Sequence, residues 1–343
     1  MSNPSVFTLT TPLALESGAT LPEVRVAYHT AGTLNATRDN VIWVCHALTA
    51  NADVLSWWPG LFGPGCHFDP ADWFIVCANI LGSCYGSTGP LTPVAAGAGP
   101  LYQEFPLVTV RDMVAAHEQL RQHLGLAKIH TLIGGSLGGQ QALEWAVQQP
   151  AAFEHLVVLA TSARHSPWGI AFNEAQRLAI FADPTYYAAT PDGGQAGLQA
   201  ARAVALLSYR SYDAYARSQA EPDAEKLTDF RASSYQQYQG AKLVARFDAY
   251  SYVALSRAMD SHNVGRGRGG EEAALGLIRA RTLVIGITSD VLFPPAEQQQ
   301  LARHIPGAQY AEMDSGFGHD GFLIETAQIT HLLERFYVRS FAQ

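Results

Sequence analysis

A serine flanked by glycines stands between a predicted strand and a predicted helix. Gly134, Ser136 and Gly138 form the pattern G-x-S-x-G within the string GGSLGG. A serine on so sharp a turn adopts strained backbone angles, and side chains two residues away on either side would collide with it. The N–H of Leu137, at the helix N-terminus, would face the oxygen that becomes negative during acyl transfer. Simple glycine-rich turns share this string, but the strand before it and the helix after it favour Ser136 as a nucleophile that forms a covalent acyl ester.

A serine nucleophile needs a general base and a residue that orients that base. Twelve histidines compete for the role of base. In proteins whose nucleophile lies on such a G-x-S-x-G turn, the acid and the base follow it in the chain order Ser, Asp or Glu, then His. Asp290 follows a late predicted strand, and His319 lies in the string GFGHDGF before the last predicted helix. We expect His319 to take the Ser136 proton and Asp290 to fix the tautomer of the imidazole.

Other residues compete for these roles. Asp314, at the end of a later predicted strand, is the alternative acid. His304 and His331 lie within predicted helices, where we interpret them as surface or packing residues. His46 comes too early in the chain to be the base, but its string CHALT follows an early strand, where a second oxyanion donor would come from the backbone. We assign that donor to the N–H of Leu48, within one residue; a plain exit from strand to loop is the alternative.

Short β-rich runs alternate with amphipathic helical runs around these residues. Strands are expected at residues 24–31, 40–48, 73–81, 129–134, 153–161, 282–288 and 309–313, and helices at 110–124, 137–149, 295–304 and 322–336. Such alternation predicts an α/β fold, with a mostly parallel sheet covered by helices on both faces.

The alternation stops in the middle of the chain. Residues 164–276 hold no strong β run, and helices are expected at 173–181, 197–207, 223–230 and 250–259, followed by a flexible glycine-rich loop at 265–270. We therefore predict a core of residues 1–163 and 277–343, with a helical lid of residues 164–276 inserted into it. Three consecutive domains are the alternative, but residues 277–343 are too few to stand alone.

The composition excludes several classes of protein. The 343 residues are 48% hydrophobic and carry a net charge of −8, which argues against disorder and against nucleic acid as a partner. No apolar run reaches the length of a membrane span, and the first eleven residues do not read as a signal peptide. Neither the four cysteines nor the histidines have metal-ligand spacing, so we expect free thiols, no metal and a cytoplasmic protein.

Six separated strings together resemble the homoserine O-acetyltransferases. They are CHALT (45–49), NILGSCYGSTG (79–89), GGSLGGQ (134–140), YQGAKLVARFDA (238–249), SDVLFPP (289–295) and GHDGFL (318–323). The likeness runs in family order from about residue 15 to residue 337. It implies an α/β-hydrolase core with a helical lid, a Ser-Asp-His triad and a homodimer joined through the lid. It also implies acetyl-CoA as a co-substrate, with no bound cofactor, and L-homoserine as the acceptor in methionine biosynthesis.

The resemblance assigns the same triad and adds residues for the acceptor. It implies that Asp320 binds the acceptor amine and that Arg210 binds the acceptor carboxylate. A zwitterionic amino acid does need an anion for its ammonium group and a bidentate cation for its carboxylate. The alternatives are a solvated helix residue for Arg210 and a helix cap for Asp320. Tyr235 or Tyr238 is a further candidate for the wall of the same pocket.

Some positions depart from the family pattern. Residues 50–53 read ANAD where many relatives have a glycine-serine stretch, Ser83 stands where glycine is common, and Gly321 where alanine is common. These differences leave the triad intact but keep a succinyl donor and a serine acceptor open. An esterase or thioesterase with water as acceptor is a rival of another class. A binding protein without catalysis would need a broken triad, and every member is present here.

Overall fold

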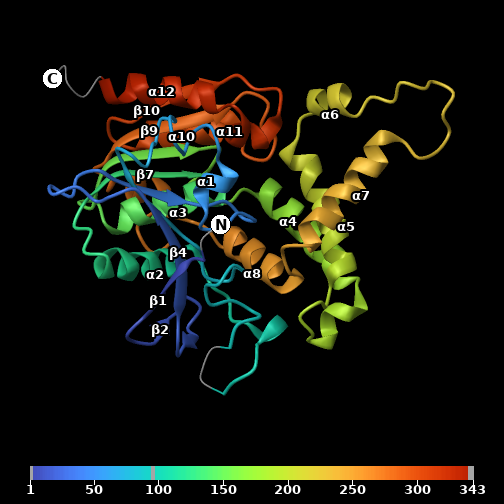
Figure 1. Ribbon diagram of the computed structural model, residues 1–343, viewed down its shortest axis with the longest axis horizontal. Helices are drawn as coiled ribbons and strands as arrows, with labels where there is room; N and C mark the ends of the chain where they lie inside the picture. The colour runs from blue at the N-terminus through green and yellow to red at the C-terminus, as the bar shows by residue number, and fades with distance from the viewer. Residues whose placement is uncertain (1–2, 94–96, 339–343) are drawn as a thin grey trace.

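One sheet forms the centre of the molecule. The structure is a computed structural model that describes residues 3–93 and 97–338 (Figure 1). In this part of the chain eight strands pair in the order β1-β4-β6-β5-β7-β8-β9-β10. Their bounds are β1 Ser5–Thr8, β4 Arg25–Ala31, β5 Val41–Cys45, β6 Phe74–Ala78, β7 Ile129–Gly135, β8 Phe153–Leu159, β9 Arg281–Ile287 and β10 Gln309–Met313. The strands from β6 to β10 in this order run parallel, and β1 and β4 run antiparallel at one edge. The predicted mostly parallel sheet is confirmed.

Helices cover both faces of the sheet, as Figure 1 shows for α2 and α12. On one face the buried core includes residues of α2 (Val110–His123), α3 (Leu137–Gln148) and α10 (Pro295–His304). On the other it includes residues of α1 (Val54–Trp57), α11 (Gly321–Ile324) and α12 (Thr326–Val338). Because both faces are covered, the central strands are apolar along their length: all five residues of β5 are buried. The α/β fold predicted from the alternation of elements is confirmed.

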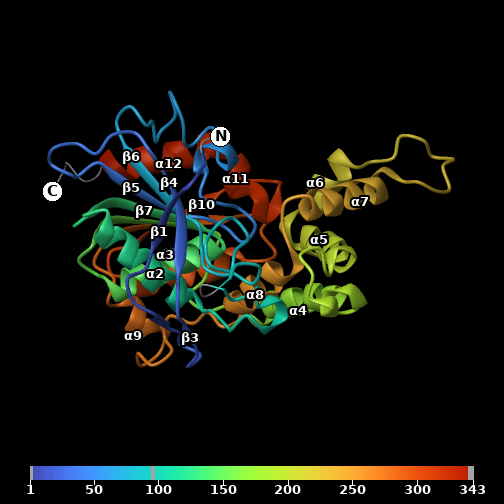
Figure 2. The same cartoon turned by 60° about the horizontal axis from the view of Figure 1, so that its bottom comes forward.

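A run of helices lies between β8 and β9. These are α4 Pro167–Phe181, α5 Gln195–Tyr209, α6 Tyr212–Ser218, α7 Arg231–Val244, α8 Ala249–Asp260 and α9 Glu271–Leu275. Figures 1 and 2 show α4 to α7 beside the core, with the connection from α6 to α7 projecting away from it. Three of these helices start at capping side chains, since Ser166, Ser211 and Asp248 each accept from the third N–H of α4, α6 and α8 respectively. No helix within residues 3–93 and 97–338 is long and apolar enough to cross a bilayer.

The division into core and lid stays a prediction, and the structure adds one detail to it. Helix α9, at the end of the predicted lid, packs against α3 and α10 rather than against the other inserted helices. The predicted glycine-rich loop precedes it, with Gly267, Gly269 and Gly270 all at positive φ. The last turn of the insertion therefore already belongs to the packing of the sheet.

The predicted helix at residues 223–230 is wrong. This segment is a loop in which Leu227 is 88% exposed and Asp229 has a φ of 57°. Eight residues without an apolar face to bury cannot offset the free-energy cost of helix nucleation. Helix α7 follows directly and was not predicted, because only Gly240 and Leu243 of its fourteen residues are buried, which leaves little apolar periodicity in the sequence. The antiparallel strands β2 (Leu13–Ala14) and β3 (Thr20–Leu21) were missed because each has two residues.

Candidate active site

Ser136 occupies a strained turn between β7 and α3. Its φ of 58° and ψ of −127° lie in a region of backbone angles that residues other than glycine rarely adopt. A Cβ added to Gly134 would lie 2.3 Å from the carbonyl oxygen of Gly138, and one added to Gly138 would lie 2.1 Å from that of Cys45. Both glycines are therefore required by close backbone approach. The turn holds the serine at the carboxyl end of the sheet.

An aspartate and a histidine far apart in the chain meet beside this turn. His319 Nδ1 lies 2.7 Å from Asp290 Oδ2. The other carboxylate oxygen, Oδ1, accepts hydrogen bonds from the backbone N–H groups of Leu292 (2.8 Å) and Phe293 (2.9 Å). Because both oxygens of Asp290 are held, the carboxylate has a fixed orientation. An Nδ1–H donated to it leaves Nε2 of the imidazole as the proton acceptor.

The surroundings of His319 shift its pKa. Burial disfavours the charged imidazolium, but the carboxylates of Asp290 and Asp320 outweigh it and raise the pKa above its ordinary value. The ring is held from two sides: its centroid lies 5.2 Å from that of Phe293 in a stacked arrangement and 5.4 Å from that of Phe322 in an edge contact. The imidazole is thus oriented, and its protonated form is stabilised by carboxylates.

The segment that carries the imidazole is packed against an inserted segment. Gly318 has a φ of 69°, and a Cβ added to it would lie 2.8 Å from the nitrogen of Ser211 and 2.9 Å from the carbonyl carbon of Arg210. The hydroxyl of Ser211 also donates a hydrogen bond to the carbonyl of Gly316. The turn between α5 and α6 therefore fixes the position of the histidine loop.

The competing residues lie elsewhere. Asp314 is exposed and accepts a hydrogen bond from Thr288 Oγ1 at 3.2 Å, without contacting the imidazole of His319. His304 lies half-buried on α10, and His331 lies exposed on α12. Neither lies on the cavity that Ser136 lines. The structure brings together Ser136, His319 and Asp290, and leaves the alternatives apart.

A cavity of about 600 Å³ opens over the serine. Ser136, His319 and Asp320 lie on its wall, and so does Leu48. Sequence reasoning assigned no site role to the remaining polar and aromatic residues of the wall, which include Asn51, Ser56, Trp57, Tyr85, Arg202, Tyr209, Lys242 and Arg246. Lys242 and Arg246 belong to the string YQGAKLVARFDA, so the resemblance carried a signal for them, whereas no motif marks Arg202.

The loop after β5 is held in place by a buried histidine. His46 Nδ1 lies 2.9 Å from the carbonyl of Ala47, and its Nε2 lies 3.1 Å from the N–H of Ile80. Burial lowers the pKa of His46 to about 4, so the ring is neutral and donates from Nδ1. This geometry places Leu48 on the cavity wall. Leu137 is the first residue of α3, and its N–H therefore has no acceptor within the helix.

Arg210 and Asp320 form an ion pair with each other. Arg210 Nε lies 2.8 Å from Asp320 Oδ2, and the two side chains are 27% and 17% exposed. Burial raises the pKa of Asp320, although Arg210 and Arg202 act in the opposite direction. Asp320 lines the cavity and Arg210 stands behind it, since only the carboxylate is part of the wall.

The two tyrosines predicted for the acceptor pocket do not lie on its wall. Tyr235 makes an edge contact with Tyr215, with ring centroids 6.0 Å apart, and Tyr238 is 60% exposed. Helix α7 starts at the projecting connection from α6, and its last turn is the part that runs toward α8 (Figure 1). Both tyrosines precede that turn, whereas Lys242 lies within it. Their prediction as pocket residues is therefore corrected.

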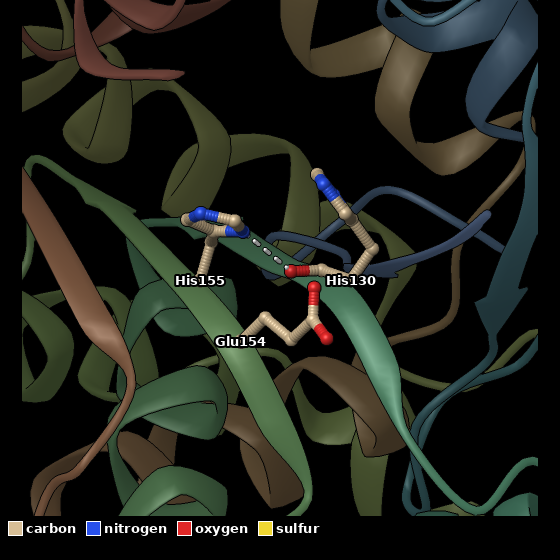
Figure 3. A group of neighbouring side chains, drawn as sticks. All are labelled: His130, Glu154 and His155. Carbon is tan, nitrogen blue, oxygen red and sulfur yellow. Dashed lines mark hydrogen bonds between the residues drawn. The ribbon is translucent and has the colours of Figure 1, made fainter. Parts of the chain in front are cut away.

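Two imidazoles and a carboxylate gather at the opposite end of β7 and β8 (Figure 3). One possible ligand atom each of His130, Glu154 and His155 lies within 4.8 Å of the others. Burial lowers the pKa of His130 to about 4, so its ring is neutral. The groups already have partners: His155 Nδ1 lies 3.0 Å from the carbonyl of His130, Glu154 pairs with Lys128 at 3.0 Å, and both rings pack against Tyr337. We interpret the two histidines as neutral rings packed at the amino ends of β7 and β8, at the opposite end of β7 from the serine.

Comparisons with known proteins agree with this architecture. The family model of the alpha/beta hydrolase fold matches residues 40–326. The homoserine O-acetyltransferase of Cyclobacterium marinum is 49% identical over 335 residues, which cover 98% of this chain and 95% of that protein. The crystal structure of homoserine O-acetyltransferase from Staphylococcus aureus has a TM-score of 0.80 at 30% identity, with 96% and 95% of the two chains covered. An acetylester hydrolase from Corynebacterium glutamicum has a TM-score of 0.85 at 25% identity, with 97% and 96% covered. The chain belongs to the homoserine O-acetyltransferase family, within the α/β-hydrolase fold.

Proposed function

We propose that this protein transfers the acetyl group of acetyl-CoA to the hydroxyl of L-homoserine, through an ester on Ser136, as a step of methionine biosynthesis. One observation carries the chemistry: His319, paired with the buried Asp290, lines the same cavity as Ser136 on its strained turn. The high identity to named homoserine O-acetyltransferases over nearly the full chain supports the donor and the acceptor.

In the first half-reaction the Ser136 oxygen attacks the thioester carbonyl of acetyl-CoA. His319 Nε2 takes the hydroxyl proton as the new C–O bond forms, and Asp290 stabilises the imidazolium. The oxyanion is bound by the backbone N–H groups of Leu48 and Leu137, which cost no reorganisation because the buried loop and the helix start are fixed in advance. The C–S bond then breaks, and the proton passes from Nε2 to the departing thiolate.

In the second half-reaction L-homoserine enters the cavity. Its ammonium group binds the Asp320 carboxylate and its carboxylate binds the Arg210 guanidinium, so the acceptor inserts into an ion pair that already holds both charges. His319 then removes the proton from the acceptor hydroxyl as that oxygen attacks the acetyl ester. The bond from the acetyl carbon to the Ser136 oxygen breaks, and His319 returns the proton to that oxygen. Because the zwitterion is bound at both charged groups, its hydroxyl is held close to the ester and attacks it more often than a water molecule does.

A CoA-release assay tests the donor and the acceptor together. Acetyl-CoA and succinyl-CoA are each measured with homoserine, serine and no acceptor. We expect the highest kcat/KM for acetyl-CoA with homoserine, and parallel lines in double-reciprocal plots when both substrates are varied. Intersecting lines, with no acetylated Ser136 by mass spectrometry, would contradict the covalent intermediate. Preference for succinyl-CoA or for serine would reassign the substrate within the same chemistry.

Hydrolysis is the second candidate function. The fold is shared with an acetylester hydrolase, in which water is the acceptor. A hydrolase would release CoA as fast without homoserine as with it. An increase in the rate of CoA release on addition of homoserine, with O-acetylhomoserine as the product, separates the two functions.

We also propose that the protein is a homodimer joined through the inserted helices. The supporting observation is a set of exposed apolar side chains on α5, α6, α7 and the loop between the last two, which comprises Leu207, Tyr212, Leu227, Phe230 and Tyr238. Buried against a second copy, such side chains would leave water. Light scattering should give a dimer for the wild type and a monomer for the Leu227→Asp, Tyr238→Asp double variant. Val6→Asp is the matched control, because Val6 is 54% exposed and lies on β1 of the central sheet rather than on an inserted helix.

A further inference from the structure

Three cations surround the cavity over Ser136. Arg202 comes from α5, Lys242 from the last turn of α7, and Arg246 from the segment just beyond that helix. Among residues 3–93 and 97–338, the only carboxylate on the wall is that of Asp320, which is already paired with Arg210. The whole chain has a net charge of −8, so the excess of positive charge at this opening does not follow from the overall composition.

The cations are held by neutral groups. Arg246 Nη1 donates to the carbonyl of Thr49 and to the hydroxyl of Tyr85, both at 2.6 Å. The guanidinium carbon of Arg202 lies 5.4 Å from the ring centroid of Tyr209. Among the described residues no carboxylate forms an ion pair with Arg202, Lys242 or Arg246. Their charge is therefore available to a ligand.

The cations differ in depth. Arg202 is half-buried and close enough to Asp320 to influence the pKa of that carboxylate. Lys242 and Arg246 are exposed, four residues apart on one side of the end of α7, and mark the mouth of the cavity. Cations at the last turn of a helix also complement its dipole, but that effect does not require them to line a cavity. Their position at the opening points to an anion that stays outside while its uncharged arm reaches the serine.

We propose that Lys242 and Arg246, with Arg202 behind them, bind the phosphate groups of the CoA donor at the cavity mouth. This inference rests on the proposed function. A cavity of about 600 Å³ holds the acyl group and part of a flexible thiol arm, and the nucleotide end of the donor remains at the opening. Lysine and arginine are the side chains that bind phosphate, as a point charge and as a planar donor fork respectively.

The test compares acetyl-CoA with acetyl-pantetheine, which has the same thioester and no phosphate. In Lys242→Gln the KM for acetyl-CoA should rise about five- to tenfold at low ionic strength. Its kcat should be retained, and kcat/KM for acetyl-pantetheine should stay at the wild-type value. Lys242→Glu should raise the KM for acetyl-CoA further. The effect should shrink with added salt, since exposed charges are screened.

Arg231→Gln is the matched control, because it removes one exposed cation from the first turn of the same helix, away from the cavity. Equal losses with both donors, or none with either, would overturn the phosphate assignment. So would a loss confined to succinylated donors, which would place an acyl carboxylate at these cations.

Binding of CoA itself, measured by calorimetry, separates this proposal from the proposed function. Wild-type protein that binds CoA, with weaker binding in Lys242→Gln, supports the phosphate site even where no acetyl transfer to homoserine is detected. Wild-type protein that binds no CoA overturns it. Arg246→Lys keeps the charge but loses the guanidinium whose Nη1 donates to Thr49 and Tyr85. Unchanged CoA affinity in this variant would assign phosphate binding to the charge rather than to the planar guanidinium.

Discussion

Arg210 Nε lies 2.8 Å from Asp320 Oδ2, and of this pair only the carboxylate reaches the wall of the cavity over Ser136. The pair stores opposite charges at a spacing suited to a zwitterion, before any acceptor is present. In the proposed mechanism the acceptor would exchange this one ion pair for two, and that exchange would select amino acids over simple alcohols.

Replacement of Arg210 should separate the two half-reactions. In Arg210→Gln we expect kcat/KM for homoserine to fall about a hundredfold, since a charge-assisted contact worth about 3 kcal/mol is lost. The burst of CoA release that reports acetylation of Ser136 should remain. Arg231→Gln, an exposed arginine outside the cavity, should leave both rates unchanged. Loss of the burst together with the transfer would mean that Arg210 supports the fold of the site rather than the acceptor.

Replacement of Asp290 should change both the rate and its pH dependence. Asp290→Asn should lower kcat about 10⁴-fold, because the amide does not hold the productive tautomer of His319. In the wild type kcat/KM should rise with pH through a pKa above the ordinary 6.5, since the neutral imidazole is the base and the carboxylates raise its pKa. In the variant burial is opposed only by the Asp320 carboxylate, so the limb should move to lower pH. Asp314→Asn, at an exposed carboxylate outside the site, should keep the wild-type profile.

The pair of His319 and Asp290 predicts how the stability of the fold depends on pH. Because the folded pKa of His319 is raised, its contribution to the free energy of unfolding is fully present below the unfolded value and is lost as pH rises through the folded pKa. Urea unfolding of the wild type and of Asp290→Asn should therefore differ most below pH 6.5 and least in the alkaline range. A difference that grows with pH would refute this assignment of the proton.

The strain at Ser136 predicts an unusual order of stability. With a φ of 58°, glycine fits the turn better than any residue with a Cβ. Both Ser136→Ala and Ser136→Gly should abolish labelling by a fluorophosphonate probe, but Ser136→Gly should be more stable than Ser136→Ala by about 1 kcal/mol. Denaturant titration measures the difference. Equal stabilities would show that the turn is not strained.

The glycine at the start of α3 should tolerate no side chain. Gly138→Ala would place a Cβ 2.1 Å from the carbonyl oxygen of Cys45. We expect a loss of more than about 3 kcal/mol of unfolding free energy, or a displaced loop after β5, since that backbone has no space to move. Gly99→Ala is the control: an added Cβ there meets no atom within 4 Å. A folded Gly138→Ala variant with wild-type kcat would contradict the close packing of these loops.

The features that sequence alone determined are local ones. The spacing of Gly134, Ser136 and Gly138 predicts the turn because steric exclusion acts over a few residues. The strand and helix patterns of the core follow from burial on both faces of a parallel sheet, and α10 and β10 have the bounds predicted for them. Chain order and flanking elements predict Asp290 and His319 as acid and base, and the structure places these two side chains 2.7 Å apart.

Other features arise only when distant segments pack together. No local pattern shows that Arg210 pairs with Asp320, that Gly318 contacts Ser211, or that Tyr235 lies off the cavity wall. Helix α7 buries only Gly240 and Leu243, so its sequence carries weak periodicity, and the helix was predicted in the exposed loop at 223–230 before it instead. The positions of the inserted helices depend on long-range contacts, and these decide which charges line the cavity.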